Sequence, residues 1–168
     1  MTLALRYAVR SDVGLLREGN EDSAYAGPHL LAVADGMGGH AAGEVASAAT
    51  ITTIAPLDDA RNIGPDLVGA LADAVAMANL RLQELIISDP AIEGMGTTLT
   101  ALLWADGYAA LCHIGDSRAY RLRNGQWIVE DLGSTNGTYL DRQKVTQPTP
   151  VPAGVPIRIG KTVLELRR

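Results

Sequence analysis

Several residue types are scarce in this chain, and each absence excludes a class of protein. The 168 residues include no Phe and only 4% aromatic residues, so the core must be built from aliphatic side chains. The single cysteine, Cys112, excludes a disulfide within the chain and suits a reducing compartment, which predicts a cytoplasmic protein. No apolar run approaches the roughly 18 residues of a membrane span, so no membrane partner is predicted.

Basic residues are also fewer than acidic residues in this chain. Fourteen Lys and Arg stand against 19 Asp and Glu, which gives a formal net charge of -5. A nucleic-acid-binding protein needs a basic face to displace counterions from phosphates, so no nucleic-acid partner is predicted. A phosphate-ester enzyme stays compatible with this balance, because it can gather acidic side chains around cations.

Residue patterns divide the first two thirds of the chain into strands, two helices and further strands. The alternation over Leu3–Ser11 predicts a strand, and the apolar run Leu30–Ala34 predicts a strand buried on both faces. An alanine-rich helix is expected over 41–55, and a second helix is expected to open at Pro65. Further strands are predicted at 97–105, 108–114 and 117–123. This order favours an α+β fold with helices packed outside a sheet.

The pattern changes from Asn124 onward. The helical periodicity disappears, and turn residues and prolines separate short apolar runs, which is typical of an all-β segment. Strands are predicted there at 126–131, 138–140, 155–159 and 162–166. We therefore predict two domains, residues 1–123 and residues 124–168.

An acidic residue ends the predicted buried strand. Asp35 is followed by Gly36, whose carbonyl can turn toward the same point as the carboxylate. Such a pair of hard oxygen donors suits Mg²⁺ or Mn²⁺. For an isolated Asp-Gly pair, an ordinary turn would be the better interpretation.

Two further acidic clusters stand near strand ends. Glu21 and Asp22 open a run expected to pair with the strand that ends at Asp35, and Asp116 lies in a tight turn. Two carboxylates about 4 Å apart repel by roughly 4 kcal/mol at an effective dielectric constant of 20, and a divalent cation removes that penalty. Arg17 would then suit a phosphate oxygen as a bidentate donor, with a surface salt bridge as the alternative.

Four spaced motifs carry a family resemblance. They are Arg17-Glu18-Gly19-Asn20-Glu21-Asp22-Ser23, Asp35-Gly36-Met37-Gly38-Gly39-His40-Ala41-Ala42-Gly43-Glu44, Gly94-Met95-Gly96-Thr97-Thr98 and His113-Ile114-Gly115-Asp116-Ser117-Arg118. In this order they resemble the bacterial branch of the PPM (PP2C-type) protein phosphatases. The resemblance implies a partial PP2C-like β-sandwich flanked by α-helices. It also implies metal-dependent hydrolysis of phosphoserine and phosphothreonine on phosphorylated partner proteins.

The resemblance also implies roles for the acidic residues. Asp35 would bridge two cations, either Mn²⁺ or Mg²⁺, with the Gly36 carbonyl on one of them. Glu21 and Asp22 would act through metal-bound water, and Asp116 would help to hold a third ion.

The resemblance also implies a residue that binds the substrate. Arg17 would bind the substrate phosphate, so Arg17, Asp22 and Asp35 form the predicted catalytic set. Better-known members carry a histidine directly after the Asp-Gly pair, whereas Met37 stands at that position here. A catalytic role for the nearby His40 is therefore left open.

The tail carries a second resemblance. The run Val129–Leu140, followed by Arg158-Ile159-Gly160-Lys161, resembles the C-terminal half of a forkhead-associated (FHA) domain, from about residue 127 to 168. That family is a β-sandwich that binds phosphothreonine on partner proteins. The resemblance implies that Asn136 contacts the bound peptide and that Ser134 and Thr135 line the same loop.

Each resemblance covers only part of its family's domain. The two later metal-binding aspartates of the phosphatases have no counterpart here, and the phosphate-binding arginine of an FHA domain is also missing. We therefore predict a chimeric chain with low or no phosphatase activity by itself. The alternatives are a phosphothreonine-binding module and a non-functional hybrid. Incomplete sheets would leave open edges, which predicts self-association.

Overall fold

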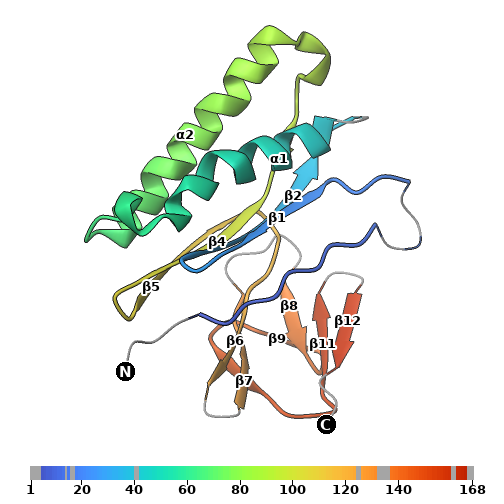
Figure 1. Cartoon of the computed structure of the whole chain (residues 1–168). Coiled ribbons are helices and arrows are strands. Elements are labelled where there is room, and N and C mark those ends of the chain that lie inside the picture. The colour runs from blue at the N-terminus through green and yellow to red at the C-terminus, as the bar shows by residue number, and fades with distance from the viewer. Residues whose placement is uncertain are drawn as a thin grey trace. The chain divides into compact units, whose positions relative to one another are not determined.

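A computed structural model of the chain describes residues 5–13, 15, 18–39, 42–123, 126–131, 137–159 and 162–165 (Figure 1). The chain divides into two units, Met1–Gly115 and Asp116–Arg168. The α+β fold class is confirmed by the helices and antiparallel sheets of these units. The domain boundary at residue 124 stays a prediction.

The first unit contains one antiparallel sheet and two long helices. Its strands are β1 (Asp22–Ala26), β2 (Leu30–Met37), β3 (Gly96–Thr97), β4 (Leu99–Ala105) and β5 (Tyr108–Ile114). Its helices are α1 (Ala42–Ile54) and α2 (Leu67–Ser88), with short 3-10 turns η1 (Ala55–Asp58), η2 (Ala60–Asn62) and η3 (Pro90–Ile92). The strand order is β1-β2-β4-β5, and β3 pairs with the end of β2.

Both helices pack on the same face of this sheet (Figure 1). Along β2, Leu30, Ala32 and Ala34 are buried under the helices, whereas Val33 is 45% exposed. The expectation of a strand buried on both faces is therefore wrong. An antiparallel sheet that carries helices on one face shows this alternation, because successive side chains point to opposite faces.

The second helix begins two residues later than its proline suggested. Asp66 is the N-cap of α2, and its side chain accepts a hydrogen bond of 2.9 Å from the backbone N–H of Gly69. Pro65 thus precedes the cap and does not open the helix. The cap satisfies one of the N–H groups that a helix start leaves without an intrahelical partner.

Two strand predictions in the first unit need correction. The segment 5–13 forms no strand although its side chains alternate, because a strand also needs a partner to share backbone hydrogen bonds. The predicted strand 97–105 is divided at Thr98 into β3 and β4. The β5 strand has its predicted bounds, Tyr108–Ile114.

The second unit is all-β, as predicted. Its strands are β6 (Tyr120–Arg123), β7 (Gln126–Val129), β8 (Thr138–Leu140), β9 (Gln143–Lys144), β10 (Thr149–Val151), β11 (Pro156–Ile159) and β12 (Thr162–Glu165). They form two sheets, β10-β7-β6 and β12-β11-β8-β9. Val129, Val145, Val151 and Ile157 form a separate aliphatic core.

The sequence did not predict β10, because prolines crowd that segment. Pro150 pairs with Ile128 of β7, and β10 lies at the edge of its sheet. A proline is tolerated at such an edge, where its missing N–H need not serve a second neighbour.

Candidate functional site

The pairing of β1 with β2 brings two predicted site residues together. In this antiparallel register Asp22 lies directly opposite Asp35. The β carbons of residues that oppose each other in this way are about 4.5–5.5 Å apart. Both residues are exposed. The predicted pairing of these two strands is therefore confirmed.

Glu21 adds a third acidic residue at the same end of the two strands. Its carbonyl oxygen accepts hydrogen bonds from the Gly36 N–H at 3.1 Å and from the Ser47 hydroxyl at 2.6 Å. Its side chain lies against the first turn of α1, since a β carbon placed on Gly43 would be 2.9 Å from Glu21 Oε1. Glu21, Asp22 and Asp35 thus lie at the same end of β1 and β2, next to the start of α1.

Gly36 allows β2 to approach α1 at this point. A β carbon at Gly36 would lie 2.0 Å from the carbonyl oxygen of Gly43 and 2.8 Å from that of Glu21. Both neighbours are backbone atoms, which cannot rotate away as a side chain can. A residue without a side chain is therefore required here.

Two threonines fix the backbone of Asp35. The Asp35 N–H donates to Thr98 Oγ1 at 2.9 Å, and the Asp35 carbonyl accepts from the Thr98 N–H at 2.9 Å. The Thr97 hydroxyl donates to the same carbonyl at 3.0 Å. Sequence reasoning assigned these threonines no role, although it included them in the third motif.

The remaining predicted site residues fall outside this cluster. Arg17, His40, Ser134, Thr135 and Asn136 lie outside the described residues. Asp116 is the first residue of the second unit, and its carbonyl oxygen accepts a hydrogen bond from Arg118 Nη1 at 2.5 Å. A role for Asp116 beside Asp35 stays a prediction.

The donor atoms of the cluster have the chemistry of a divalent-cation site. Carboxylate and carbonyl oxygens are the hard ligands that Mg²⁺ and Mn²⁺ prefer. Among the residues that the structure describes, no three His, Cys, Asp or Glu side chains converge closely enough to hold a metal ion. The cluster therefore fits the ion by donor type only.

A hollow lies elsewhere in the first unit. It has a volume of about 480 Å³ and is bounded by η1, η2 and the first half of α2, with Leu57, Pro65 and Met77 in its walls. It also contacts Thr53, at the end of α1 opposite to the acidic cluster. It is therefore not part of the candidate site.

Comparisons with known proteins match both parts of the chain. The chain is 56% identical over 126 residues to the serine/threonine protein phosphatase PstP of Mycobacterium tuberculosis. This match covers 75% of this chain and 24% of that protein, so the chain spans about a quarter of the length of this relative. The catalytic domain of PstP, solved in complex with two manganese ions, superposes with a TM-score of 0.75 at 42% identity. This structural match covers 93% of this chain and 76% of that domain.

The chain belongs to the PPM (PP2C-type) serine/threonine protein phosphatase family.

A second family matches part of the same chain. Residues 112–160 match the family model described as FHA domain. The FHA domain-containing protein FhaB of Mycolicibacterium smegmatis is 44% identical over 97 residues, which covers 51% of this chain and 60% of that protein. The PstP and FhaB matches together exceed the whole chain, so they share a segment. The predicted PPM-plus-FHA arrangement is thereby confirmed.

No helix formed by the described residues combines the length and apolar character that a membrane crossing requires.

Proposed function

We propose that this chain carries the metal-dependent half of a protein phosphatase site that hydrolyses phosphoserine and phosphothreonine on proteins. The observation that carries the proposal is the cross-strand pairing of Asp22 with Asp35, with Glu21 beside them. Membership of the PPM family and the manganese-bound PstP neighbour support the same chemistry.

We assign Asp35 as the central metal ligand, with the Gly36 carbonyl as a second donor. Glu21 and Asp22 contribute negative charge next to it, and Asp116 and Arg17 complete the proposed set as a further ligand and a phosphate-binding group. A bound Mn²⁺ or Mg²⁺ lowers the pKa of coordinated water and neutralises charge on the phosphate. The protein's own contribution is to hold Asp35 in place through Thr97 and Thr98, and to keep the carboxylates on adjacent strands.

The proposed activity of the isolated chain is low. The chain has no counterpart of the family's two later metal-binding aspartates, and a cation held by few carboxylates binds weakly. Full activity would then require a partner that completes the ligand set. Phosphorylated proteins are the proposed substrates, and the cytoplasm is the proposed location because the chain has a single cysteine.

Metal binding and turnover test this proposal separately. Calorimetric titration with Mn²⁺ should show weak binding that Asp35→Asn reduces by about tenfold or more, because a ligand loses its charge. Hydrolysis of an aryl phosphate should be slow, dependent on Mn²⁺ and absent in Asp35→Asn. Asp73→Asn is a matched control, since Asp73 lies on α2 away from the cluster. Equal Mn²⁺ binding by wild type and Asp35→Asn would refute the proposed site.

The FHA match supports a second candidate function, the binding of a phosphothreonine peptide. Residues 112–160 carry this match, and their all-β unit has its own aliphatic core. Ser134, Thr135 and Asn136 are the proposed peptide-binding residues. Fluorescence anisotropy with a phosphothreonine peptide should detect binding that Asn136→Ala abolishes, while the unphosphorylated peptide should not bind. A chain that binds neither Mn²⁺ nor the peptide would be the non-functional hybrid.

A further inference from the structure

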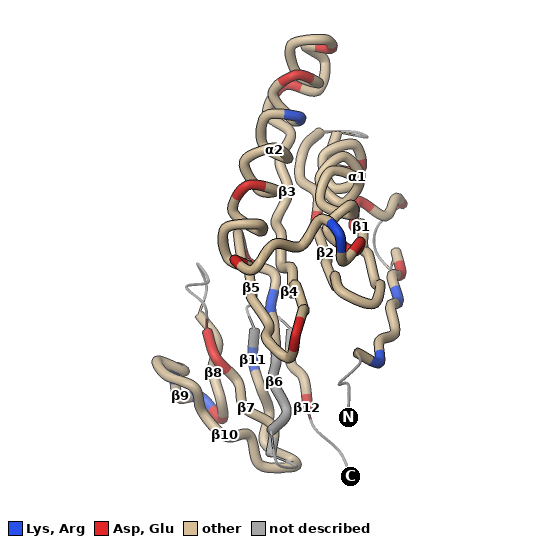
Figure 2. Tube along the Cα trace, turned by 60° about the vertical axis from the view of Figure 1, so that its left-hand side comes forward, with Lys and Arg blue, Asp and Glu red and all other residues tan. Residues whose placement is uncertain are grey.

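The edge strand β5 differs in composition from the other sheet edges. Its sequence is Tyr-Ala-Ala-Leu-Cys-His-Ile, seven residues without Asp, Glu, Lys, Arg or Pro (Figure 2). Among the described strands, only β4 pairs with β5. Sheet edges are usually protected by charged residues, by proline or by being very short, because an unprotected edge pairs with another chain.

The other edges of the described sheets carry such protection. In the first unit, β1 begins with Asp22, and β3 is two residues long. In the second unit, β10 contains Pro150, β9 contains Lys144 and β12 contains Glu165. The sequence of β6 includes two arginines. Of these edges, β5 is the longest, and it is the only one above two residues that has neither charge nor proline.

The turn before β5 determines which backbone groups point outward. Asp106 and Gly107 have φ angles of 51° and 84°, and they connect Ala105 to its partner Tyr108. Two successive positive φ angles define a two-residue type I′ hairpin, in which the closing pair is hydrogen-bonded. Tyr108, Ala110, Cys112 and Ile114 therefore direct their N–H and C=O groups toward β4. The intervening Ala109, Leu111 and His113 direct theirs away from it.

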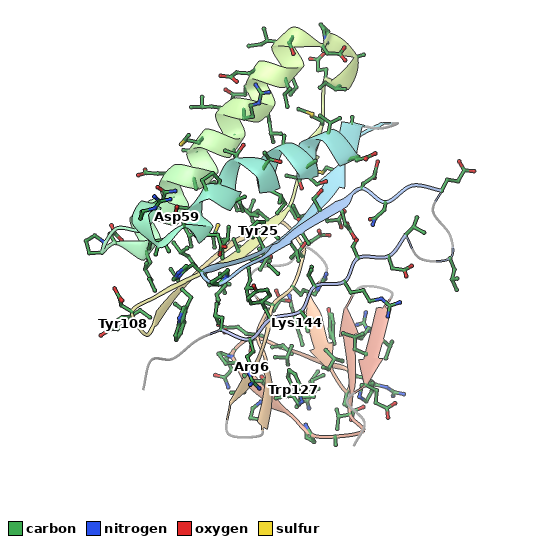
Figure 3. All side chains as sticks on the ribbon, in the orientation of Figure 1. Arg6, Tyr25, Asp59, Tyr108, Trp127 and Lys144 are labelled. Atoms are coloured by element: carbon green, nitrogen blue, oxygen red, sulfur yellow. The ribbon has the colours of Figure 1, made fainter. Side chains whose placement is uncertain are left out.

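The exposed side chains of β5 are complementary to themselves under a twofold rotation. Tyr108 lies at the tip of the β4–β5 hairpin (Figure 3). It is 75% exposed, Leu111 is 51% exposed and Ile114 is 42% exposed. If two copies of β5 pair in antiparallel fashion about Leu111, each Tyr108 opposes Ile114 of the other copy. An aromatic residue opposite a β-branched residue is a favourable cross-strand pair. The two Leu111 side chains then meet on the axis.

We propose that β5 is a homodimerisation edge, on which a second copy of this chain adds its own β5 as an antiparallel strand. The contact is isologous, with Leu111 on the twofold axis. Ala109 and His113 of one copy exchange hydrogen bonds with His113 and Ala109 of the other, and the two Leu111 residues bond to each other. This assigns a location to the predicted self-association, and it is independent of the proposed phosphatase activity.

Sedimentation velocity of the full chain over a wide concentration range tests the proposal. Leu111→Pro removes an outward N–H and leaves the bonds to β4 intact, so we expect its dimer dissociation constant to rise by about tenfold or more. Leu111→Val keeps the N–H and the strand preference, and it should dimerise like wild type. Leu111→Lys is the second variant in case the proline variant fails to fold. It places like charges on the axis and should also abolish the dimer.

A disulfide trap tests the register. In the proposed dimer Ala110 opposes Cys112 of the other copy, whereas Ala109 opposes His113. Under glutathione disulfide, Ala110→Cys should therefore yield a covalent dimer that Ala109→Cys does not. A wild-type chain that stays monomeric at the highest concentration would overturn the proposal, and so would Leu111→Pro dimerising as well as Leu111→Val. Equal cross-linking of both cysteine variants would overturn the register and the edge assignment with it.

Discussion

Asp58 closes the β1–β2 hairpin that carries the acidic cluster at its other end. Its Oδ1 accepts hydrogen bonds from the backbone N–H groups of His29 at 2.8 Å and Leu30 at 2.9 Å. Its Oδ2 accepts from the Tyr25 hydroxyl at 3.1 Å. Leu30 is completely buried, so water cannot replace a lost bond to its N–H without rearrangement. A carboxylate at the end of η1 therefore ties the hairpin to the helical layer.

Asp58→Ala should lower the free energy of unfolding of the first unit by about 3 kcal/mol. A hydrogen bond to a charged acceptor contributes about 1.5–3 kcal/mol, and a buried N–H without a partner costs about 1–3 kcal/mol. Two such bonds would contribute about 3–6 kcal/mol, and the partial exposure of Asp58 to solvent places the expected loss at the lower end of that range. Asp58→Asn keeps an oxygen that can accept both backbone bonds, so it should cost only about 1 kcal/mol.

The two tryptophans allow each unit to be followed separately. Trp104 lies on β4 and Trp127 on β7. In a Trp127→Phe background, the fluorescence of Trp104 during urea denaturation reports on the first unit alone. An Asp58→Ala variant that unfolds within about 0.5 kcal/mol of its parent, or no more easily than Asp58→Asn, would refute the proposed role of the carboxylate.

A double-mutant cycle with Gly27 isolates the contact. A β carbon at Gly27 would lie 2.2 Å from Asp58 Oδ2, so Gly27→Ala should destabilise the wild type by pushing the carboxylate away from its donors. In the Asp58→Ala background that obstruction is gone, and the same change should cost less. Residues in contact commonly show coupling of about 0.5–3 kcal/mol. Additive effects of the two substitutions would mean that they do not meet in the folded protein.

Two further predictions concern the site and the alkaline limit of stability. Gly36→Ala should destabilise the first unit by about 3 kcal/mol or more and weaken Mn²⁺ binding, because its β carbon meets the Gly43 carbonyl at 2.0 Å. Gly39→Ala, with nothing within 4 Å, is the control for thermal melting and calorimetry, and equal melting of the two variants would contradict the prediction. Burial and the hydrogen bond to Asp58 raise the pKa of Tyr25 above its ordinary value of 10.0. The folded state therefore holds this proton more tightly, so stability is complete below about pH 10 and falls as the pH rises through the folded pKa. Urea denaturation of Tyr25→Phe should lack that alkaline loss, and an unchanged pH profile would count against it.

Local sequence predicted much of the site's framework. Short loops join β1 to β2 and β4 to β5, so each of these predicted strands had its antiparallel partner next to it in the sequence. This is why the meeting of Asp22 with Asp35 and the bounds of β5 followed from the sequence. Cys112 is partly buried, and this burial raises the pKa of its thiol.

No local sequence pattern indicated the contacts between segments that are distant along the chain. Asp35 bonds to Thr98, 63 residues away, and Asp58 bonds to Leu30, 28 residues away. Neither partner can be chosen from periodicity, because many threonines and aspartates fit the same local pattern. The strand-like alternation of residues 5–13 failed for the same reason, since alternation describes a face and pairing supplies the hydrogen bonds.

The amino-acid sequence by itself determined the two family resemblances, the α+β class and the donor chemistry of the acidic cluster, because motifs and hydrophobic periodicity are properties of neighbouring residues. Only the tertiary structure decided that β2 exposes one face, that Thr97 and Thr98 fix Asp35, and that β5 lies at a sheet edge. These features arise when strands far apart in sequence share hydrogen bonds, and the register of that pairing is set by the packed core as a whole.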